Sequence, residues 1–167
     1  KIFLEAHKNP TIHIGGELNC INSNVFVGDK NFFITEACEY VDSFLNLKSN
    51  VSVILNVQED HMDYFKTTKN LQNSFQKYLK STNKNGFLIL NADDEFLVGI
   101  KSDKKIIKYG IKNKQANIFA KNIRECKYSK FSFDIFVGGK KLTRVKLPCV
   151  GMHQIYNALA ATSICLA

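Results

Sequence analysis

Short apolar runs alternate with polar segments along the first two thirds of the chain, and this pattern predicts an α/β fold. Six runs have the composition of strands: 11–14, 25–27, 31–34, 51–55, 87–91 and 105–109. The run at 51–55 is continuously apolar, as expected of a strand buried on both faces of a parallel sheet. Residues 69–80 carry apolar side chains at helical spacing, which predicts an amphipathic helix. We therefore expect a mostly parallel sheet flanked by helices over about residues 11–110, with a hairpin-type turn at residues 28–30.

The pattern changes after Gly110. Three further strands are predicted, at 118–123, 131–137 and 142–147, and Gly138-Gly139 is expected to form the turn between the last two. These strands predict a small antiparallel three-stranded sheet. The segment 152–166 is rich in alanine and predicts a helix that the chain enters through Gly151.

Composition narrows the function classes. The chain has 167 residues, 45% of them hydrophobic and 23% charged, which is ordinary for one soluble globular domain. Its formal charge of +8 comes from lysine, with only two arginines, so a nucleic-acid site is not favoured on charge alone. The five cysteines show no CxxC spacing, which favours reduced thiols in a cytoplasmic protein. There is no apolar run near 18 residues, and we expect no membrane span.

Two candidate ligands for a divalent cation each follow an apolar strand. Glu36 lies just after the run 31–34, and His61 lies beyond the run 51–55. In an open α/β sheet, the carboxyl ends of the strands meet in one crevice. Magnesium prefers oxygen ligands and manganese accepts an imidazole more readily. On spacing alone, a surface carboxylate and a loop or helix-capping histidine explain these residues better. The neighbouring carboxylates of Glu59, Asp60 and Asp63 add weight to a cationic partner.

Other polar residues have simple structural explanations as well as functional ones. Asp93 and Asp94 follow the strand 87–91 and suit the N-cap of a helix. His153 and Asn157 lie four residues apart, so they share one helix face and could bind the edge of a base, although a core histidine and a capping asparagine are commoner. Gly138-Gly139-Lys140-Lys141 lacks the GxxxxGK[ST] spacing of a phosphate-binding loop and is interpreted as a hairpin.

Taken together, these segments resemble the central ATP-binding domain of the Mur ligases, the ATP-dependent enzymes that build the peptide stem of peptidoglycan. The resemblance covers nearly the whole chain, in four segments in the family's order: 36–45, 56–63, 91–94 and 151–161. It implies a P-loop-NTPase-like α/β fold. The first segment is most similar to the member that joins L-alanine to UDP-N-acetylmuramate. Phe75 stands where ligases for later residues carry a carbamylated lysine, which points to the same member.

The resemblance implies a reaction and roles for single residues. ATP would phosphorylate the lactyl carboxylate of UDP-N-acetylmuramate, and the amine of L-alanine would then displace phosphate to form an amide. The roles implied are Mg²⁺ or Mn²⁺ ligation by Glu36 and His61, substrate contact by Asn56, adenine binding by Asn157 with His153 beside it, and shaping of the nucleotide end by Asp93 and Asp94.

The chain departs from the family pattern at four positions: Cys38, Tyr40, Val41 and Gln154. The first three replace acidic or small residues of the motif, which puts any role of those side chains in doubt. Gln154 keeps the amide of the usual asparagine but has a longer reach.

Residues 1–167 are expected to be the central domain of a longer enzyme. The family's phosphate-binding loop, its amino-terminal domain for the uridine nucleotide and its carboxy-terminal domain are not recognisable in this sequence, so the piece alone is expected to be inactive. A ligase that recycles a whole tripeptide, and more distantly a folate polyglutamate synthase, remain alternatives. A non-catalytic nucleotide- or RNA-binding module would instead bind in a salt-dependent and magnesium-independent way. The oligomeric state is left open.

Overall fold

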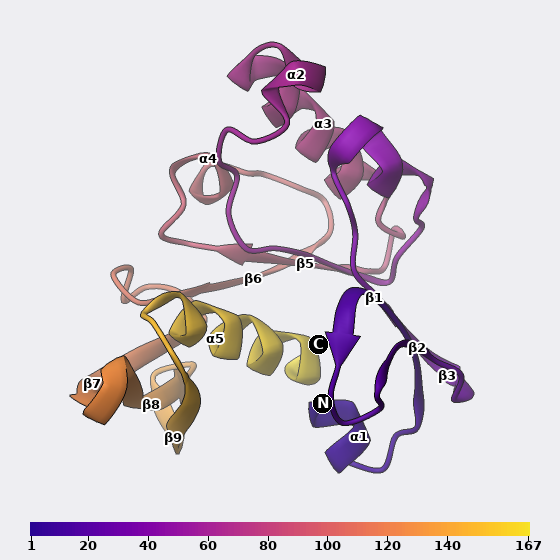
Figure 1. Cartoon of the computed structure of the whole chain (residues 1–167). Coiled ribbons are helices and arrows are strands. Elements are labelled where there is room, and N and C mark those ends of the chain that lie inside the picture. Colours follow the sequence, from indigo (N-terminus) through magenta and orange to yellow (C-terminus); the bar gives the residue numbers. More distant parts are fainter. The chain divides into compact units, whose positions relative to one another are not determined.

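The computed structural model describes all residues, Lys1–Ala167, and the chain divides into two compact units, Lys1–Phe44 and Leu45–Ala167 (Figure 1). In the smaller unit a three-stranded sheet has the order β2-β1-β3. Its elements are α1 (Ile2–Glu5), β1 (Pro10–Leu18), β2 (Ser23–Phe26) and β3 (Asp29–Thr35). A 3-10 segment, η1 (Tyr40–Asn46), follows β3.

The larger unit is built on a six-stranded sheet with the order β4-β5-β6-β7-β8-β9. Its strands are β4 (Val51–Ile54), β5 (Phe87–Asn91), β6 (Lys105–Gly110), β7 (Ile118–Cys126), β8 (Lys130–Val137) and β9 (Lys140–Val150). Its helices are α2 (Met62–Phe65), α3 (Thr68–Ser81), α4 (Glu95–Val98), the short 3-10 turn η2 (Lys127–Ser129) and α5 (His153–Leu166). No helix combines the length and the apolar character needed to cross a lipid bilayer.

The α/β fold class is confirmed, and the expected three antiparallel strands are present. β4 to β7 pair in parallel, and β7, β8 and β9 pair antiparallel. These three strands continue the parallel sheet through the pairing of Tyr109 with Ile118, instead of forming a sheet of their own. The turn at Gly138-Gly139 is also confirmed, with φ of 54° and 80°, values that glycine tolerates best.

The predicted hairpin between 25–27 and 31–34 is wrong, because β1 lies between these two strands. β2 pairs antiparallel with β1, and β3 pairs with β1 in parallel. The turn passes across the start of β1, where the Asp29 N–H donates to Asn9 O (2.7 Å) and the Gly28 N–H donates to Thr11 Oγ1 (3.1 Å). A Cβ at Gly28 would lie 2.1 Å from Asn9 O, so only glycine fits this crossing.

The expectation that the strand at 11–14 joins the parallel sheet is wrong for the same reason. This segment belongs to β1 at the centre of the three-stranded sheet, whereas the strands of the six-stranded sheet begin at β4. Sequence patterning marks a strand but does not state its partner, because strand pairing depends on contacts that are distant along the chain.

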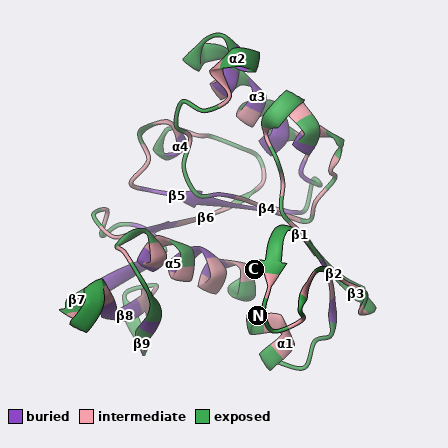
Figure 2. Cartoon of the chain, viewed as in Figure 1, coloured by how far each residue is buried: buried purple, intermediate pink, exposed green.

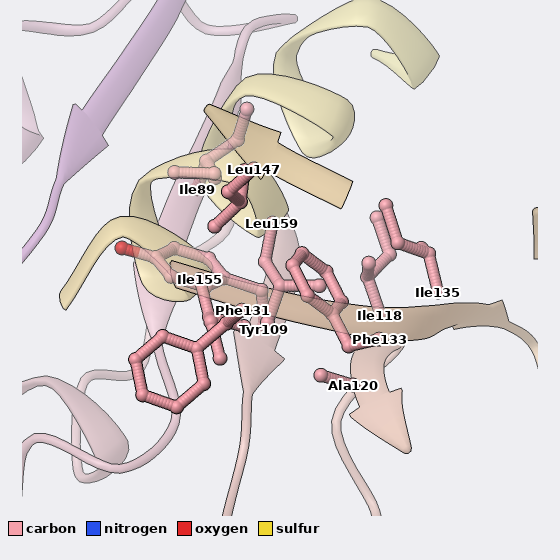
Figure 3. Close-up of a cluster of buried hydrophobic side chains, with 11 residues drawn as sticks. Ile89, Tyr109, Ile118, Ala120, Phe131, Phe133, Ile135, Leu147, Ile155 and Leu159 are labelled. Carbon is pink, nitrogen blue, oxygen red and sulfur yellow. The ribbon is translucent and has the colours of Figure 1, made fainter. Parts of the chain in front are cut away.

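Helices cover both faces of the six-stranded sheet, as Figure 2 shows by the buried strands between more exposed helices. In β4, Val51 and Val53 pack into the core beneath α5, while Ser52 points to the opposite face and contacts Tyr78 of α3. The predicted helix at 69–80 is confirmed as α3. Figure 3 shows Ile155 and Leu159 of α5 pointing into a cluster of buried side chains from the sheet.

The antiparallel strands also hold a polar network around a buried carboxylate. The Asp134 side chain is only 5% exposed, and it accepts hydrogen bonds from Asn122 Nδ2 (2.8 Å) and Arg144 Nη1 (3.0 Å) and pairs with Lys141 Nζ (3.0 Å). The hydrogen bond from Asn122, followed by those from Lys141 and Arg144, lowers the pKa of Asp134 to about 2. The network joins the three strands on the face opposite α5.

We expect Asp134→Asn to lower stability at neutral pH, with a deficit that shrinks in acid. Because the pKa in the folded state lies below the unfolded value of about 3.9, the stability contributed by the carboxylate is present above pH 4 and is lost as the pH falls towards 2. Urea unfolding between pH 6 and pH 2 measures this deficit. Asp103→Asn is the control, since Asp103 is 78% exposed; a deficit for Asp134→Asn that does not change with pH would contradict the assignment.

Candidate functional site

Side chains at the carboxyl end of β5 and just after it form hydrogen bonds to the loop that follows β4. Asn91 Nδ2 donates to Leu55 O (3.0 Å), and Asp94 Oδ2 accepts from the Val57 N–H (2.9 Å). Asp94 Oδ1 also accepts from two N–H groups in the first turn of α4 (3.0 and 2.8 Å), which confirms the predicted N-cap. Asn56 lies between the two anchored residues of the β4 loop and is exposed.

Asp93 connects this edge to the loop after β6 and to α5. Its carboxylate accepts hydrogen bonds from the backbone N–H groups of Ile111 (2.6 Å), Lys112 (2.8 Å) and Asn113 (2.7 Å). The hydroxyl of Tyr156 in α5 donates the fourth (2.9 Å). Both carboxylate oxygens are therefore occupied by the protein, and Asp93 acts by holding the loop and the helix in place.

These hydrogen bonds set the protonation of the pair. Burial alone would raise the pKa of Asp93, but the N–H donors of Lys112, Ile111 and Asn113 and the Tyr156 hydroxyl outweigh it and lower this pKa. Burial, with the hydrogen bond and charge of Asp93, raises the pKa of Tyr156 to about 12. At neutral pH the pair is a carboxylate accepting from a neutral phenol.

The first turns of α5 present the predicted base-binding pair to solvent. His153 and Asn157 are both exposed on the helix. Gln154 joins them, because Asn157 Nδ2 donates to Gln154 Oε1 (3.3 Å) and Gln154 Nε2 lies 3.0 Å from His153 Nε2. Gly151 has a φ of 99°, and a Cβ there would lie 2.5 Å from the imidazole ring, so the entry to the helix requires glycine.

Glu36 follows β3 in the smaller unit and is held by β1. The Glu36 N–H donates to His13 O (3.0 Å), and its side-chain Oε2 accepts from the Gly15 N–H (2.7 Å). The second carboxylate oxygen, Oε1, accepts no hydrogen bond from the protein, and the residue is exposed. One oxygen of the Glu36 carboxylate is therefore held by β1, and the other has no partner in the protein.

His61 lies in the larger unit, at the N-cap of α2, with a left-handed backbone (φ 52°, ψ 39°). Asp60 Oδ1 accepts from the His61 N–H (2.8 Å) and lies 4.0 Å from the imidazole Nδ1. The neighbouring Glu59 accepts a hydrogen bond from the Thr68 hydroxyl at the start of α3. The loop thus holds the imidazole, 36% exposed, beside the carboxylate of Asp60.

The chemistry of these two side chains suits a divalent cation. A carboxylate oxygen fits Mg²⁺ or Mn²⁺, and an imidazole nitrogen fits Mn²⁺ better than Mg²⁺. The expectation that both residues follow strands of one sheet is wrong, since β3 and β4 belong to different sheets. Glu36 directly follows β3, whereas His61 lies further along the loop after β4, at the N-cap of α2.

Two residues of this region were not singled out from the sequence. Tyr156 lies within the motif around His153, but its partner Asp93 is 63 positions away, so no local pattern announces the bond. Gly15 belongs to a Gly-Gly pair that suggests only a turn. Its contact with Glu36 depends on the parallel pairing of β1 with β3.

We expect Tyr156→Phe to reduce the free energy of unfolding by about 1.5–3 kcal/mol, the usual range for a hydrogen bond to a charged group. The three backbone donors to Asp93 remain, so the fold is expected to persist. Urea unfolding at pH 7 gives the value. Tyr128→Phe is the matched control, because the Tyr128 side chain is 83% exposed; equal losses for both variants would show that the Tyr156 hydroxyl contributes no specific stability.

Comparison with known proteins finds relatives in both sequence and fold. The family model described as Mur ligase middle domain matches residues 16–165. The UDP-N-acetylmuramate–L-alanine ligase of Acetivibrio thermocellus is 37% identical over 99% of this chain and 36% of its own length, and the enzyme of that name from Clostridium kluyveri is 42% identical with the same two coverages. The chain thus spans about a third of these relatives.

Solved structures agree in fold. The UDP-N-acetylmuramate-alanine ligase of Thermotoga maritima has a TM-score of 0.80 at 21% identity and is matched over 98% of this chain and 36% of that one. The UDP-N-acetylmuramate:L-alanyl-γ-D-glutamyl-meso-diaminopimelate ligase of Neisseria meningitides has a TM-score of 0.81 at 23% identity, over 99% and 55%. A third, the MurF ligase of Thermotoga maritima in complex with ADP, has a TM-score of 0.70 at 13% identity, over 98% and 41%.

Proposed function

Because the chain belongs to the Mur ligase family through its middle domain, we propose that it is the central ATP-binding domain of a ligase that joins L-alanine to UDP-N-acetylmuramate in peptidoglycan synthesis. The observation that carries the proposal is the similarity, over almost the whole chain, to relatives named for this reaction. The enzyme would act in the cytoplasm, where ATP is available. The rest of the catalytic machinery would come from flanking domains of a longer polypeptide.

The proposed reaction has two steps that balance. The lactyl carboxylate oxygen attacks the γ-phosphorus of ATP, and ADP leaves. The amine of L-alanine then attacks the carbon of the acyl phosphate, phosphate leaves, and the amine loses a proton as the amide forms. A bound Mg²⁺ or Mn²⁺ would supply electrostatic stabilisation where anionic reactants meet.

The residues of this chain would bind and orient the reactants. Glu36 and His61 would hold the cation, Glu36 through its oxygen Oε1, which has no protein partner. Asn56, exposed just beyond β4, would contact the substrate. Asn157 would hydrogen-bond the adenine edge with His153 beside it.

Asp93 and Asp94 would support the nucleotide end indirectly. Asp93 orders the loop 111–113 and anchors α5 through Tyr156, and α5 carries the two adenine-binding residues. Asp94 orders the loop that carries Asn56 through its bond to the Val57 N–H.

The tripeptide-recycling ligase is the second candidate. Its fold likeness is as close as that of the alanine ligase, with TM-scores of 0.81 and 0.80, so fold alone does not separate the two. The acceptor, L-alanine or tripeptide, distinguishes them in an assay.

We expect the full-length polypeptide that carries this chain to release ADP in a reaction that requires UDP-N-acetylmuramate and L-alanine. Glu36→Ala should lower kcat at least about a hundredfold, because charge stabilisation in the transition state is lost. Glu125→Ala, which removes an exposed carboxylate on β7, is the matched control and should stay within about twofold of wild type.

Other outcomes of this assay point elsewhere. Activity with the tripeptide alone would assign the recycling reaction. Inactivity with both acceptors, combined with nucleotide or RNA binding that weakens steeply with salt and survives Glu36→Ala, would favour the non-catalytic binding module.

We expect Asn157→Ala to raise the KM for ATP about tenfold with a smaller change in kcat, because it removes a hydrogen bond made equally in the ground and transition states. Steady-state kinetics at saturating L-alanine measure both constants. Asn73→Ala changes an exposed amide on α3 and serves as the control. An unchanged KM for ATP in Asn157→Ala would rule out the proposed adenine contact.

A further inference from the structure

Both the main chain and the carboxylate of Glu36 form hydrogen bonds to the backbone of β1. The register of β1 and β3 pairs His13 with Thr35, and the ladder extends one residue further through the hydrogen bond from the Glu36 N–H to His13 O (3.0 Å). The next contact along β1 is made by the side chain of Glu36, whose Oε2 accepts a hydrogen bond from the Gly15 N–H at 2.7 Å. Main chain and side chain of Glu36 are thus both fixed by the same strand.

The bond to Gly15 orients the carboxylate as well as its backbone. A glutamate has three rotatable side-chain bonds, and an exposed one normally samples several rotamers. An N–H donor that engages Oε2 selects the rotamers that keep this contact, and it leaves Oε1 without a protein partner. Outer contacts of this kind orient metal-binding side chains in proteins.

The absence of a side chain at position 15 makes this arrangement possible. A Cβ at Gly15 would lie 3.1 Å from Glu36 Oε2, which is closer than most real Cβ contacts, and 3.5 Å from Cδ, an ordinary van der Waals distance. A Cβ at the next residue, Gly16, would have nothing within 4 Å. Neither glycine has a positive φ, so alanine fits the backbone at both positions and differs only in what its methyl group meets.

We propose that Gly15 is a positioning residue for cation binding: its N–H orients the Glu36 carboxylate, and its lack of a Cβ leaves the space that this orientation needs. The inference rests on the proposed function, in which Glu36 holds the cation. Gly15 itself contacts neither substrate nor cation. It acts through Glu36.

The test measures Mn²⁺ binding directly, by electron paramagnetic resonance titration of the full-length polypeptide with UDP-N-acetylmuramate and a non-hydrolysable ATP analogue present. Gly15→Ala is expected to weaken Mn²⁺ binding about tenfold, at the lower end of the range for lost outer contacts. Gly16→Ala is the matched control, and its Mn²⁺ affinity and unfolding midpoint should equal those of wild type. Glu36→Ala should weaken binding more than Gly15→Ala.

A double variant separates positioning from a general structural effect. If Gly15 acts only through the carboxylate, Gly15→Ala added to Glu36→Ala causes no further loss of Mn²⁺ affinity, because the two effects are not additive. A further loss, or an unfolding midpoint for Gly15→Ala well below that of Gly16→Ala, would overturn the inference. Wild-type affinity in Gly15→Ala with weak binding in Glu36→Ala would overturn it too, while leaving the proposed function intact. Wild-type affinity in Glu36→Ala would instead overturn the metal role of Glu36 and, with it, the inference.

Discussion

The larger unit depends on one half-buried anchor, the carboxylate of Asp93. Its four hydrogen bonds join the end of β5 to the loop after β6 and to α5, elements that are far apart along the chain. An ionised carboxylate can accept several N–H and O–H donors at once, which no apolar residue can do. Because α5 carries His153 and Asn157, this anchor also determines where the proposed base-binding face lies.

Apolar packing holds α5 against the sheet, in addition to the hydrogen bond between Tyr156 and Asp93. Ile155 and Leu159 bury one side of α5 against the sheet (Figure 3), whereas His153 and Asn157 in its first turns are exposed. Burial is non-directional, so it holds the helix against the sheet without choosing its position along the helix axis. The hydrogen bond from Tyr156 to Asp93 adds that choice.

In the smaller unit, backbone groups of β1 hold Glu36 in place. β1 lies between β2 and β3, and its middle provides both the carbonyl of His13 and the N–H of Gly15 that hold Glu36. At two positions the lack of a side chain lets another part of the chain come close: Gly28, where the chain crosses the start of β1, and Gly15, beside the Glu36 carboxylate. In both units a carboxylate or a helix is thus placed by a partner that is remote in sequence.

The α/β class, the helices α3 and α5, most strands, the Asp94 cap and the motifs that identify the family could all be predicted from the amino-acid sequence. These are local properties, because periodicity, capping and motif spacing act over a few residues. Only the tertiary structure decided that β1 separates β2 from β3, that the antiparallel strands extend the parallel sheet, and that Tyr156 and Gly15 contact Asp93 and Glu36. Strand partners and hydrogen bonds between distant segments follow from the free energy of the whole packed chain, which no local pattern encodes.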